Sequence, residues 1–255
     1  MAESMTDHQA KPQKVYFYAT CLVDLFYPDV GLAGIKLLER EGVEVIFPQD
    51  QSCCGQPAYT SGLNEQAREV AAAQLQLFAE DWPIVIPSGS CAAMFKRHYP
   101  KLFHGTEWEQ LANDVAERSW DLTEFLLVVC QLQLQDYGEP IKVAMHTSCT
   151  ARREMGLTDV GPKLLARLSN VDLIEHPRIT ECCGFGGTFS VRHPDISESL
   201  VQDKAQALLS TGVECFLSSD CGCLINVRGY AQKQNMRLEG QHIISFLWQR
   251  SNERG

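Results

Sequence analysis

Two blocks of cysteines with nearly the same internal spacing divide this chain into a tandem repeat. Their members, in chain order, are Cys21, Cys53, Cys54 and Cys91 in the first block and Cys149, Cys182, Cys183, Cys221 and Cys223 in the second. The first cysteines of the blocks lie 128 residues apart, the adjacent pairs 129 apart, and Cys91 and Cys223 132 apart. Chance does not space a rare residue so regularly, so the chain is predicted to contain two copies of one structural unit.

The turn-rich segment 137–140 is the predicted boundary between the copies. We predict a disordered tail over 1–13, a first cysteine-rich domain over 14–138 and a second over 139–255. The polar first residues lack the apolar stretch of a signal peptide, which favours a cytoplasmic protein. The apolar run 125–130 is far shorter than the roughly 20 residues that span a bilayer, so no transmembrane segment is expected.

Each half alternates between segments typical of strands and segments typical of helices. In the first half, strands are expected at 15–19, 43–47 and 84–86, and helices at 31–41 and 63–80. In the second half, strands are expected at 143–146, 171–174 and 215–217, and helices at 161–168 and 196–209. This alternation predicts an α/β fold of two pseudo-symmetric Rossmann-like units with mostly parallel sheets.

The repeated cysteines follow the predicted strands, where parallel sheets collect their functional groups. Cys21 and Cys149 come directly after strands, and Cys91 comes shortly after the strand at 84–86. The thiols of each half are therefore expected to meet at one edge of its sheet. Since cytosolic thiols stay reduced, 11 cysteines favour metal binding or redox chemistry over disulfides.

Four thiolates in each half would suffice for an iron–sulfur cluster or a tetrahedral zinc ion. Neighbouring side chains tend to diverge, so the adjacent cysteines favour a multi-iron cluster over a single small ion. The glycines that follow them, Gly55 and Gly184, are expected to let the backbone approach the cofactor and donate N–H groups to sulfur.

Three other residues near the repeated set have less specific interpretations. Cys130 in a predicted helix and Cys215 in a predicted strand have no counterpart, and we interpret both as core thiols. His146 lies three residues before Cys149, where it could donate a hydrogen bond to a cluster sulfur or simply pack. Its counterpart in the first half is Tyr18.

The charge of the chain excludes one class of partner. The formal net charge is −10, the calculated pI is about 5.2, and no cluster of lysines and arginines occurs. A nucleic-acid partner normally needs a basic face, so none is expected.

The doubled motif resembles the CCG, or cysteine-rich, domain found in heterodisulfide reductases and in glycolate oxidase iron–sulfur subunits. The finer features resemble the small two-repeat proteins of the lactate-utilisation A family, also known as LutA, LldE or YkgE. The segments that carry this likeness are 53–58 (CCGQPA), 87–91 (PSGSC) and 182–191 (CCGFGGTFSV). The resemblance extends from Val15 to about Trp248.

The chain departs from the heterodisulfide reductase pattern in its last cysteines. That pattern ends in Cys-x-x-Cys and supplies five thiolates to a non-cubane [4Fe–4S] cluster. This chain offers only Cys91 in the first half, and Cys221-Gly222-Cys223 in the second. Counting residues allows either of the last two as the counterpart of Cys91. We favour Cys223 because Tyr230 then follows at nearly the spacing that separates Tyr99 from Cys91, which leaves Cys221 as a fifth ligand or a bystander.

The resemblance implies an iron–sulfur electron-transfer subunit of a system that oxidises L-lactate to pyruvate, with one [4Fe–4S]-type cluster in each half. The implied partners are a LutB-like, ferredoxin-containing subunit and a LutC-like subunit. No flavin or nicotinamide fingerprint is found, so lactate oxidation on this chain alone is not expected. Two alternatives are a scaffold stabilised by zinc in one or both sites, and a thiol–disulfide redox enzyme.

Overall fold

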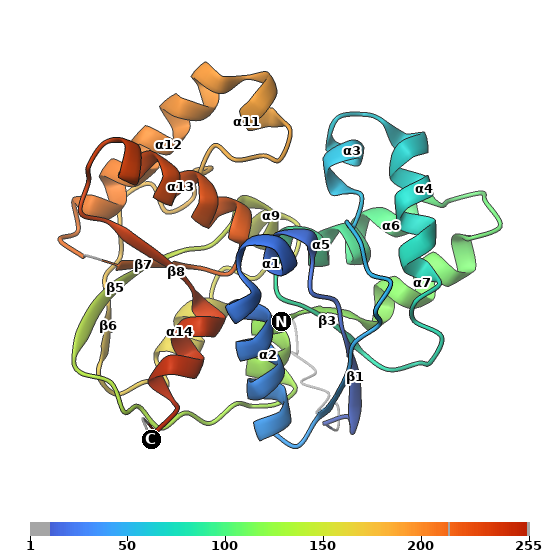
Figure 1. Cartoon of the computed structure of the whole chain (residues 1–255), viewed down its shortest axis with the longest axis horizontal. Helices are drawn as coiled ribbons and strands as arrows, with labels where there is room; N and C mark the ends of the chain where they lie inside the picture. Colours follow the sequence, from blue (N-terminus) through green and yellow to red (C-terminus); the bar gives the residue numbers. More distant parts are fainter. Residues whose placement is uncertain (1–10, 214, 254–255) are drawn as a thin grey trace, which may run out of the picture.

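The structure, a computed structural model, describes residues 11–213 and 215–253 as two α/β units packed against each other (Figure 1). Each unit contains a four-stranded sheet in which every neighbouring pair of strands is parallel. The predicted fold class is therefore confirmed. Positions 1–10 of the predicted disordered tail lie outside the described residues.

The elements of the two units follow in chain order. The first unit contains β1 (Lys14–Phe17), α1 (Cys21–Phe26), α2 (Pro28–Arg40), β2 (Glu44–Ile46), α3 (Gln56–Thr60), α4 (Asn64–Leu75), β3 (Ile84–Ile86), α5 (Gly89–Ala93), a π-helical segment (Met94–His98), α6 (Tyr99–Leu102), α7 (Glu109–Arg118), β4 (Ser119–Asp121) and α8 (Leu122–Val128). The second contains β5 (Ile141–His146), α9 (Cys149–Arg153), α10 (Val160–Leu165), β6 (Val171–Leu173), α11 (Phe189–Arg192), α12 (Pro194–Leu209), β7 (Cys215–Ser218), α13 (Cys221–Lys233), β8 (Glu239–His242) and α14 (Ile243–Arg250).

The sequence prediction lacked the strands β4 and β8, and two further details differ. The helix expected over 63–80 ends at Leu75, and the chain then turns toward β3. Cys130 is buried as expected, but it lies beyond the end of α8 rather than within a helix. Its backbone N–H still bonds to the carbonyl oxygen of Phe125 at 3.0 Å, so the chain leaves α8 in a tight turn. No helix among the described residues is long and apolar enough to cross a membrane.

The order of the strands places a switch point at the middle of each sheet. The orders are β2-β1-β3-β4 and β6-β5-β7-β8. From the first strand, the chain goes to one side for the second strand and to the other side for the third. Loops that leave the carboxyl ends of the two central strands therefore diverge, and such a divergence is where ligands bind in open α/β sheets.

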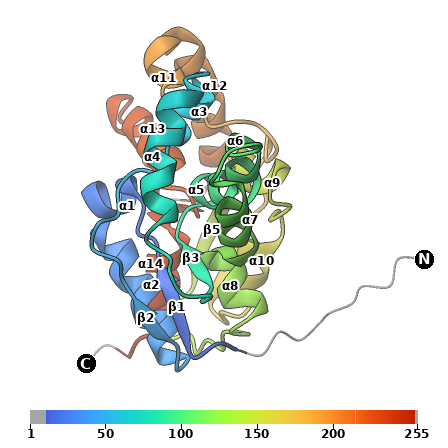
Figure 2. The same cartoon turned by 90° about the vertical axis from the view of Figure 1, so that its right-hand side faces the viewer.

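A continuous apolar core joins the two units. Helices α2 and α8 of the first unit pack against α14 and α10 of the second, and α2 and α14 lie side by side in Figure 1. Each unit also has a separate core on the outer face of its sheet. Figure 2 shows that α3 and α11, from different units, lie at the same end of the molecule. There the hydroxyl groups of Ser61 and Thr188 are 2.7 Å apart.

The last helix of each unit begins at a buried polar side chain in the equivalent place. Asp121 accepts hydrogen bonds from the backbone N–H groups of Thr123 and Glu124 at the start of α8. The Nδ1 atom of His242 accepts one from Ile244 at the start of α14. Burial raises the pKa of Asp121 to about 6 and lowers the pKa of His242 to about 4. Burial disfavours the charged form of both groups, so their shifts have opposite signs.

These shifts predict opposite effects on the pH dependence of stability. His242 contributes stability that is present above pH 6.5 and is lost as the pH falls through about 4. Asp121 contributes stability that is present below pH 3.8 and is lost as the pH rises through about 6. Asparagine also caps helices well, so His242→Asn and Asp121→Asn keep the cap while removing the titration.

We expect His242→Asn to reduce the loss of unfolding free energy between pH 7 and 4 by on the order of 2 kcal/mol. Asp121→Asn should make that loss larger, because it removes the opposing contribution. Urea unfolding of both variants and the parent chain at pH 4, 5, 6 and 7 measures the slopes. Equal slopes in the two variants would contradict the assignment.

Candidate functional site

All eight repeated cysteines line one cavity of about 210 Å³ between the two units. We call Cys21, Cys53, Cys54 and Cys91 the first thiol group, and Cys149, Cys182, Cys183 and Cys223 the second thiol group. A water molecule occupies roughly 30 Å³ in the liquid, so a cavity of this volume has room for a group much larger than one water. The structure thus brings each predicted set together and places the two sets around a common space.

Hydrogen bonds between thiols connect the members of the first thiol group. The Sγ atoms of Cys54 and Cys91 are 3.4 Å apart. Hydrogen bonds from Cys21 and Cys54 lower the pKa of Cys53 to about 3, and backbone N–H groups at Gly55 and Cys54 act in the same direction. The pKa of Cys21 is raised in return, since its thiol is the donor to Cys53. The hydrogen bonds from its neighbours therefore favour negative charge at Cys53.

The second thiol group repeats this arrangement with different electrostatics. The Sγ atoms of Cys183 and Cys223 are 3.1 Å apart. The hydrogen bond from Cys183 is the largest influence and favours the Cys223 thiolate. Burial together with the charges of Asp220 and the neighbouring thiols still raises the pKa of Cys223 to about 11. The hydrogen bond from Cys149 likewise favours the Cys182 thiolate, yet the bond to Cys183 and burial leave the pKa of Cys182 raised. A metal bound here would have to displace protons from these thiols.

The glycine after each cysteine pair is required by the backbone. Gly55 and Gly184 both have φ = +84°, a left-handed conformation that side chains disfavour. A Cβ atom on Gly184 would lie 2.5 Å from the carbonyl oxygen of Ser197 in α12, and one on Gly55 would lie 3.1 Å from that of Ala67 in α4. The N–H of Gly184 also donates to Cys182 Sγ at 3.3 Å. The glycine therefore positions the loop against a helix and supplies a donor to sulfur.

Long polar side chains hold the second cysteine of each pair. The hydroxyl group of Tyr99 donates to the carbonyl oxygen of Cys54 at 3.0 Å. The side-chain amide of Asn226 donates to the carbonyl oxygen of Cys183 at 2.8 Å. The two units use different residues for the same task, which simple repeat spacing does not reveal.

A buried carboxylate that sequence reasoning missed connects the two thiol groups. Asp220 of the second unit accepts hydrogen bonds from the backbone N–H of Ser90, at 3.0 Å, and from the hydroxyl group of Ser88 in the first unit. It also accepts one from the N–H of Gly222 at the start of α13. Burial raises its pKa. At the 132-residue offset Asp220 corresponds to Ser88, so an acidic residue in place of serine was the available signal.

The same alignment explains the position of Cys221. At that offset Cys221 corresponds to Gly89, where an added Cβ atom would lie 2.7 Å from the Cβ of Ala151 in the other unit. Cys221 is likewise turned into the shared apolar core, and it is 1% exposed. The structure thus places Cys223, and not Cys221, among the residues that line the cavity. A ligand role for Cys221 therefore stays a prediction, and the position of the residue in the apolar core argues against it.

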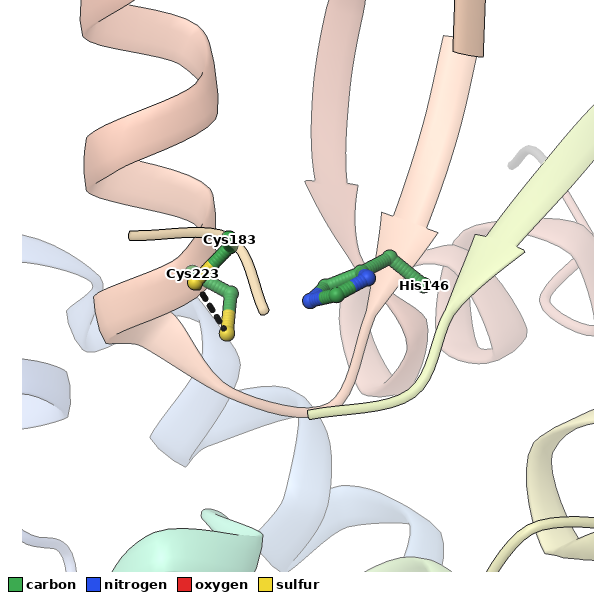
Figure 3. A group of neighbouring side chains, drawn as sticks. All are labelled: His146, Cys183 and Cys223. Carbon is green, nitrogen blue, oxygen red and sulfur yellow. Dashed lines mark hydrogen bonds between the residues drawn. The ribbon is translucent and has the colours of Figure 1, made fainter. Parts of the chain in front are cut away.

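Two further buried groups surround the second thiol group. His146 at the end of β5 lies beside Cys183 and Cys223, with its ring pointing toward their sulfur atoms (Figure 3). Lys204 of α12 is 1% exposed and donates to the carbonyl oxygen of Arg178. Burial lowers the pKa of Lys204 to about 8, while the nearby thiols of Cys183 and Cys223 act in the opposite direction.

The donor set fits a metal centre that prefers sulfur. Each group offers four thiols at the carboxyl edge of a sheet, and thiolates suit zinc and iron–sulfur clusters. The N–H group directed at Cys182 is typical of the hydrogen bonds that surround such ligands. Which of these cysteines bind a metal stays a prediction.

Comparison with known protein families agrees with this geometry. A family model described as "Cysteine-rich domain" matches residues 15–96 and 143–228, one match in each unit. The chain belongs to the cysteine-rich domain family.

Two proteins similar to this member of the cysteine-rich domain family have the same name. "Lactate utilization protein A" of Geobacillus sp. (strain WCH70) is 40% identical over 237 residues, which cover 92% of this chain and 98% of that protein. The protein of the same name from Bacillus subtilis (strain 168) is also 40% identical, with the same coverage. These matches place the chain in the lactate utilization protein A group of the family.

The fold is also found in a solved structure. A crystal structure of a hypothetical protein from Helicobacter pylori matches with a TM-score of 0.65 and 8% sequence identity. The match covers 96% of this chain and 50% of that protein, so this chain spans half the length of the solved structure. At this identity the likeness supports the fold alone.

The glycine positions provide a test of how rigidly the cysteine loops are held. We expect Gly184→Ala to destabilise the protein more than Gly55→Ala, because its Cβ atom meets a backbone oxygen at the shorter distance. Gly212→Ala is the matched control, since Gly212 has φ = +73° but no atom within 4 Å of the added Cβ. The control should cost about 1–2 kcal/mol from the left-handed conformation alone. Urea unfolding measures the three values, and a Gly184→Ala cost no larger than the control would refute the contact.

Proposed function

We propose that this protein is an iron–sulfur electron-transfer subunit of a multi-protein system that oxidises L-lactate to pyruvate. Each thiol group would hold one cluster of the [4Fe–4S] type. The observation that carries the proposal is the grouping of eight thiols, four from each unit, around one cavity. The name of the similar proteins supports the connection with lactate.

A cluster bound to these cysteines would supply one-electron redox chemistry, which amino-acid side chains alone do not provide. The chain's own contribution is ligation, burial and orientation. Cys54, Cys91, Cys183 and Cys223 are each at most 8% exposed, so water has little access to the inner ligands. The N–H group of Gly184 stabilises negative charge on sulfur.

The proposal also explains why the two thiol groups face each other. Electron transfer needs centres at a fixed, short separation, and the hydrogen bond from Ser90 to Asp220 connects the helices that carry Cys91 and Cys223. Oxidation of lactate itself would take place on a partner. We therefore retain a LutB-like, ferredoxin-containing subunit and a LutC-like subunit as the proposed partners.

The first test is the composition of the anaerobically isolated protein. We expect iron and acid-labile sulfide in comparable amounts, and reduction of the iron by L-lactate only when both partner subunits are added. Visible absorbance and EPR of the reduced and oxidised forms follow the redox state. Zinc alone, at one ion per thiol group, would refute the proposal in favour of a structural scaffold. Turnover of a disulfide by the isolated protein would favour a thiol–disulfide enzyme.

The second test assigns the ligands. We expect Cys54→Ser to remove most of the metal from the first thiol group and spare the second, and Cys183→Ser to do the reverse. Each serine leaves a weaker ligand at the inner position of its own group while the other group keeps four thiols. Metal analysis of each variant measures the loss.

The matched control is Cys130→Ser, since Cys130 is also buried but lies outside the cavity. Its metal content should equal that of the parent chain. Full metal content in both the Cys54→Ser and Cys183→Ser variants would exclude these cysteines as ligands.

A further inference from the structure

His146 is a fully buried histidine that lacks the hydrogen bonds expected of one. Its side chain is 0% exposed, and neither ring nitrogen has a hydrogen-bond partner among the described residues. A buried polar group without a partner is destabilising, so native structures normally provide one. The missing partner therefore needs an explanation.

In the first unit, the side chain at the equivalent position does have a hydrogen-bond partner. Tyr18, the counterpart of His146, donates its hydroxyl hydrogen to the carbonyl oxygen of Ser52 at 2.5 Å. The unsatisfied group is thus particular to the second unit and is not a general feature of the fold at this point.

The surroundings of the His146 ring indicate which kind of partner its nitrogen would have. One nitrogen of His146 and the sulfur atoms of Cys183 and Cys223 all lie within 4.8 Å of one another, and all three residues are buried. Figure 3 shows the ring directed at the pair of sulfur atoms. A tetrahedral ion with metal–sulfur bonds of about 2.3 Å and metal–nitrogen bonds of about 2.0 Å separates these atoms by roughly 3.5–3.8 Å. A small movement of the side chains would complete that geometry.

The backbone positions these three residues independently. His146 ends β5, Cys183 lies in the loop after β6, and Cys223 lies in the first turn of α13 after β7. Three segments that converge from separate strands at the carboxyl edge of a sheet are typical of a built site rather than of a local turn.

We propose that His146 is a metal ligand through one ring nitrogen, so that the second thiol group binds its metal through nitrogen and sulfur. The first thiol group, with Tyr18 in that place, binds through sulfur alone. Imidazole and thiolate together suit zinc, iron and cobalt. This inference rests on the proposed function only in assuming that the second thiol group binds a metal.

The assignment has a consequence for the two centres. Replacing thiolate by neutral imidazole in the ligand set of an iron–sulfur centre raises its reduction potential. The same shift would apply to the second unit where His146 takes the place of one of the four thiolates as a ligand. The centre of the second unit would then accept an electron in preference to that of the first.

The test uses Co²⁺ as a probe of the full-length chain, prepared anaerobically with reduced thiols and no bound metal. A Cys54→Ser background disables the first thiol group, so that only the second retains four thiols. We compare this chain with versions that also carry His146→Gln or Tyr18→Phe. Absorbance titration gives the Co²⁺ affinity, pulsed EPR gives the nitrogen coupling, and circular dichroism checks folding.

We expect strong nitrogen coupling in the Cys54→Ser chain and its loss in His146→Gln, together with at least about tenfold weaker Co²⁺ binding. Tyr18→Phe should leave both unchanged. Unchanged affinity and coupling in folded His146→Gln would overturn the assignment, and so would weaker binding without any nitrogen coupling in the starting chain.

Labelling histidine with ¹⁵N supplies a readout that does not depend on a variant folding. The nitrogen coupling should change its isotope pattern in the labelled Cys54→Ser chain, and an unchanged spectrum would refute a histidine ligand. A failure of the parent and Cys54→Ser chains to bind Co²⁺ would instead overturn metal binding itself, and with it the proposed function.

Discussion

One buried carboxylate organises the site. Asp220 accepts hydrogen bonds from the N–H groups of Ser90 and Gly222, which lie in the first turns of α5 and α13. The partial positive charges of two helix starts, one from each unit, thus share one acidic side chain. Cys91 and Cys223 follow within one turn of these contacts, so their separation depends on Asp220. This polar link lies beside the two thiol groups and adds to the apolar core that joins the units.

The repeat preserves the backbone and the thiols while changing the chemistry around them. Three of the equivalent positions that differ are Tyr18 and His146, Gln74 and Lys204, and Asp24 and Arg152. Gln74 and Lys204 are equivalent because the buried positions of α4 recur in α12 130 residues later along the chain. Gln74 makes neutral hydrogen bonds to Ser52, whereas Lys204 brings an amine near Cys183 and Cys223. Because local charge and hydrogen bonds tune a bound cluster, two centres held in this chain would differ in reduction potential.

The features that depend on local sequence pattern, namely the central strands, the repeat and the grouping of thiols within each half, could be predicted. Apolar runs predicted the central strands. The repeated cysteines follow these strands, which predicted that the thiols of each half meet at the carboxyl edge of a sheet. The sequence could not show that both edges open into one cavity, because that depends on α2 and α8 packing against α14 and α10. Cys130 was placed in a helix because its surroundings are apolar, but α8 ends two residues earlier. The role of His146 was left open, since only the three-dimensional structure shows that its ring lacks a partner.

The separation of the apolar cores explains how the chain can hold two centres with independent ligand sets. Cys54 and Cys91 pack into the outer core of the first unit, and Cys183 and Cys223 into that of the second. The core that joins the units instead consists of the helices between the sheets and includes Cys221, which lines no part of the cavity. Rearrangement of thiols in one group therefore acts first on the outer core of its own unit. The apolar interface between the units is therefore built from residues outside the eight thiols that line the cavity.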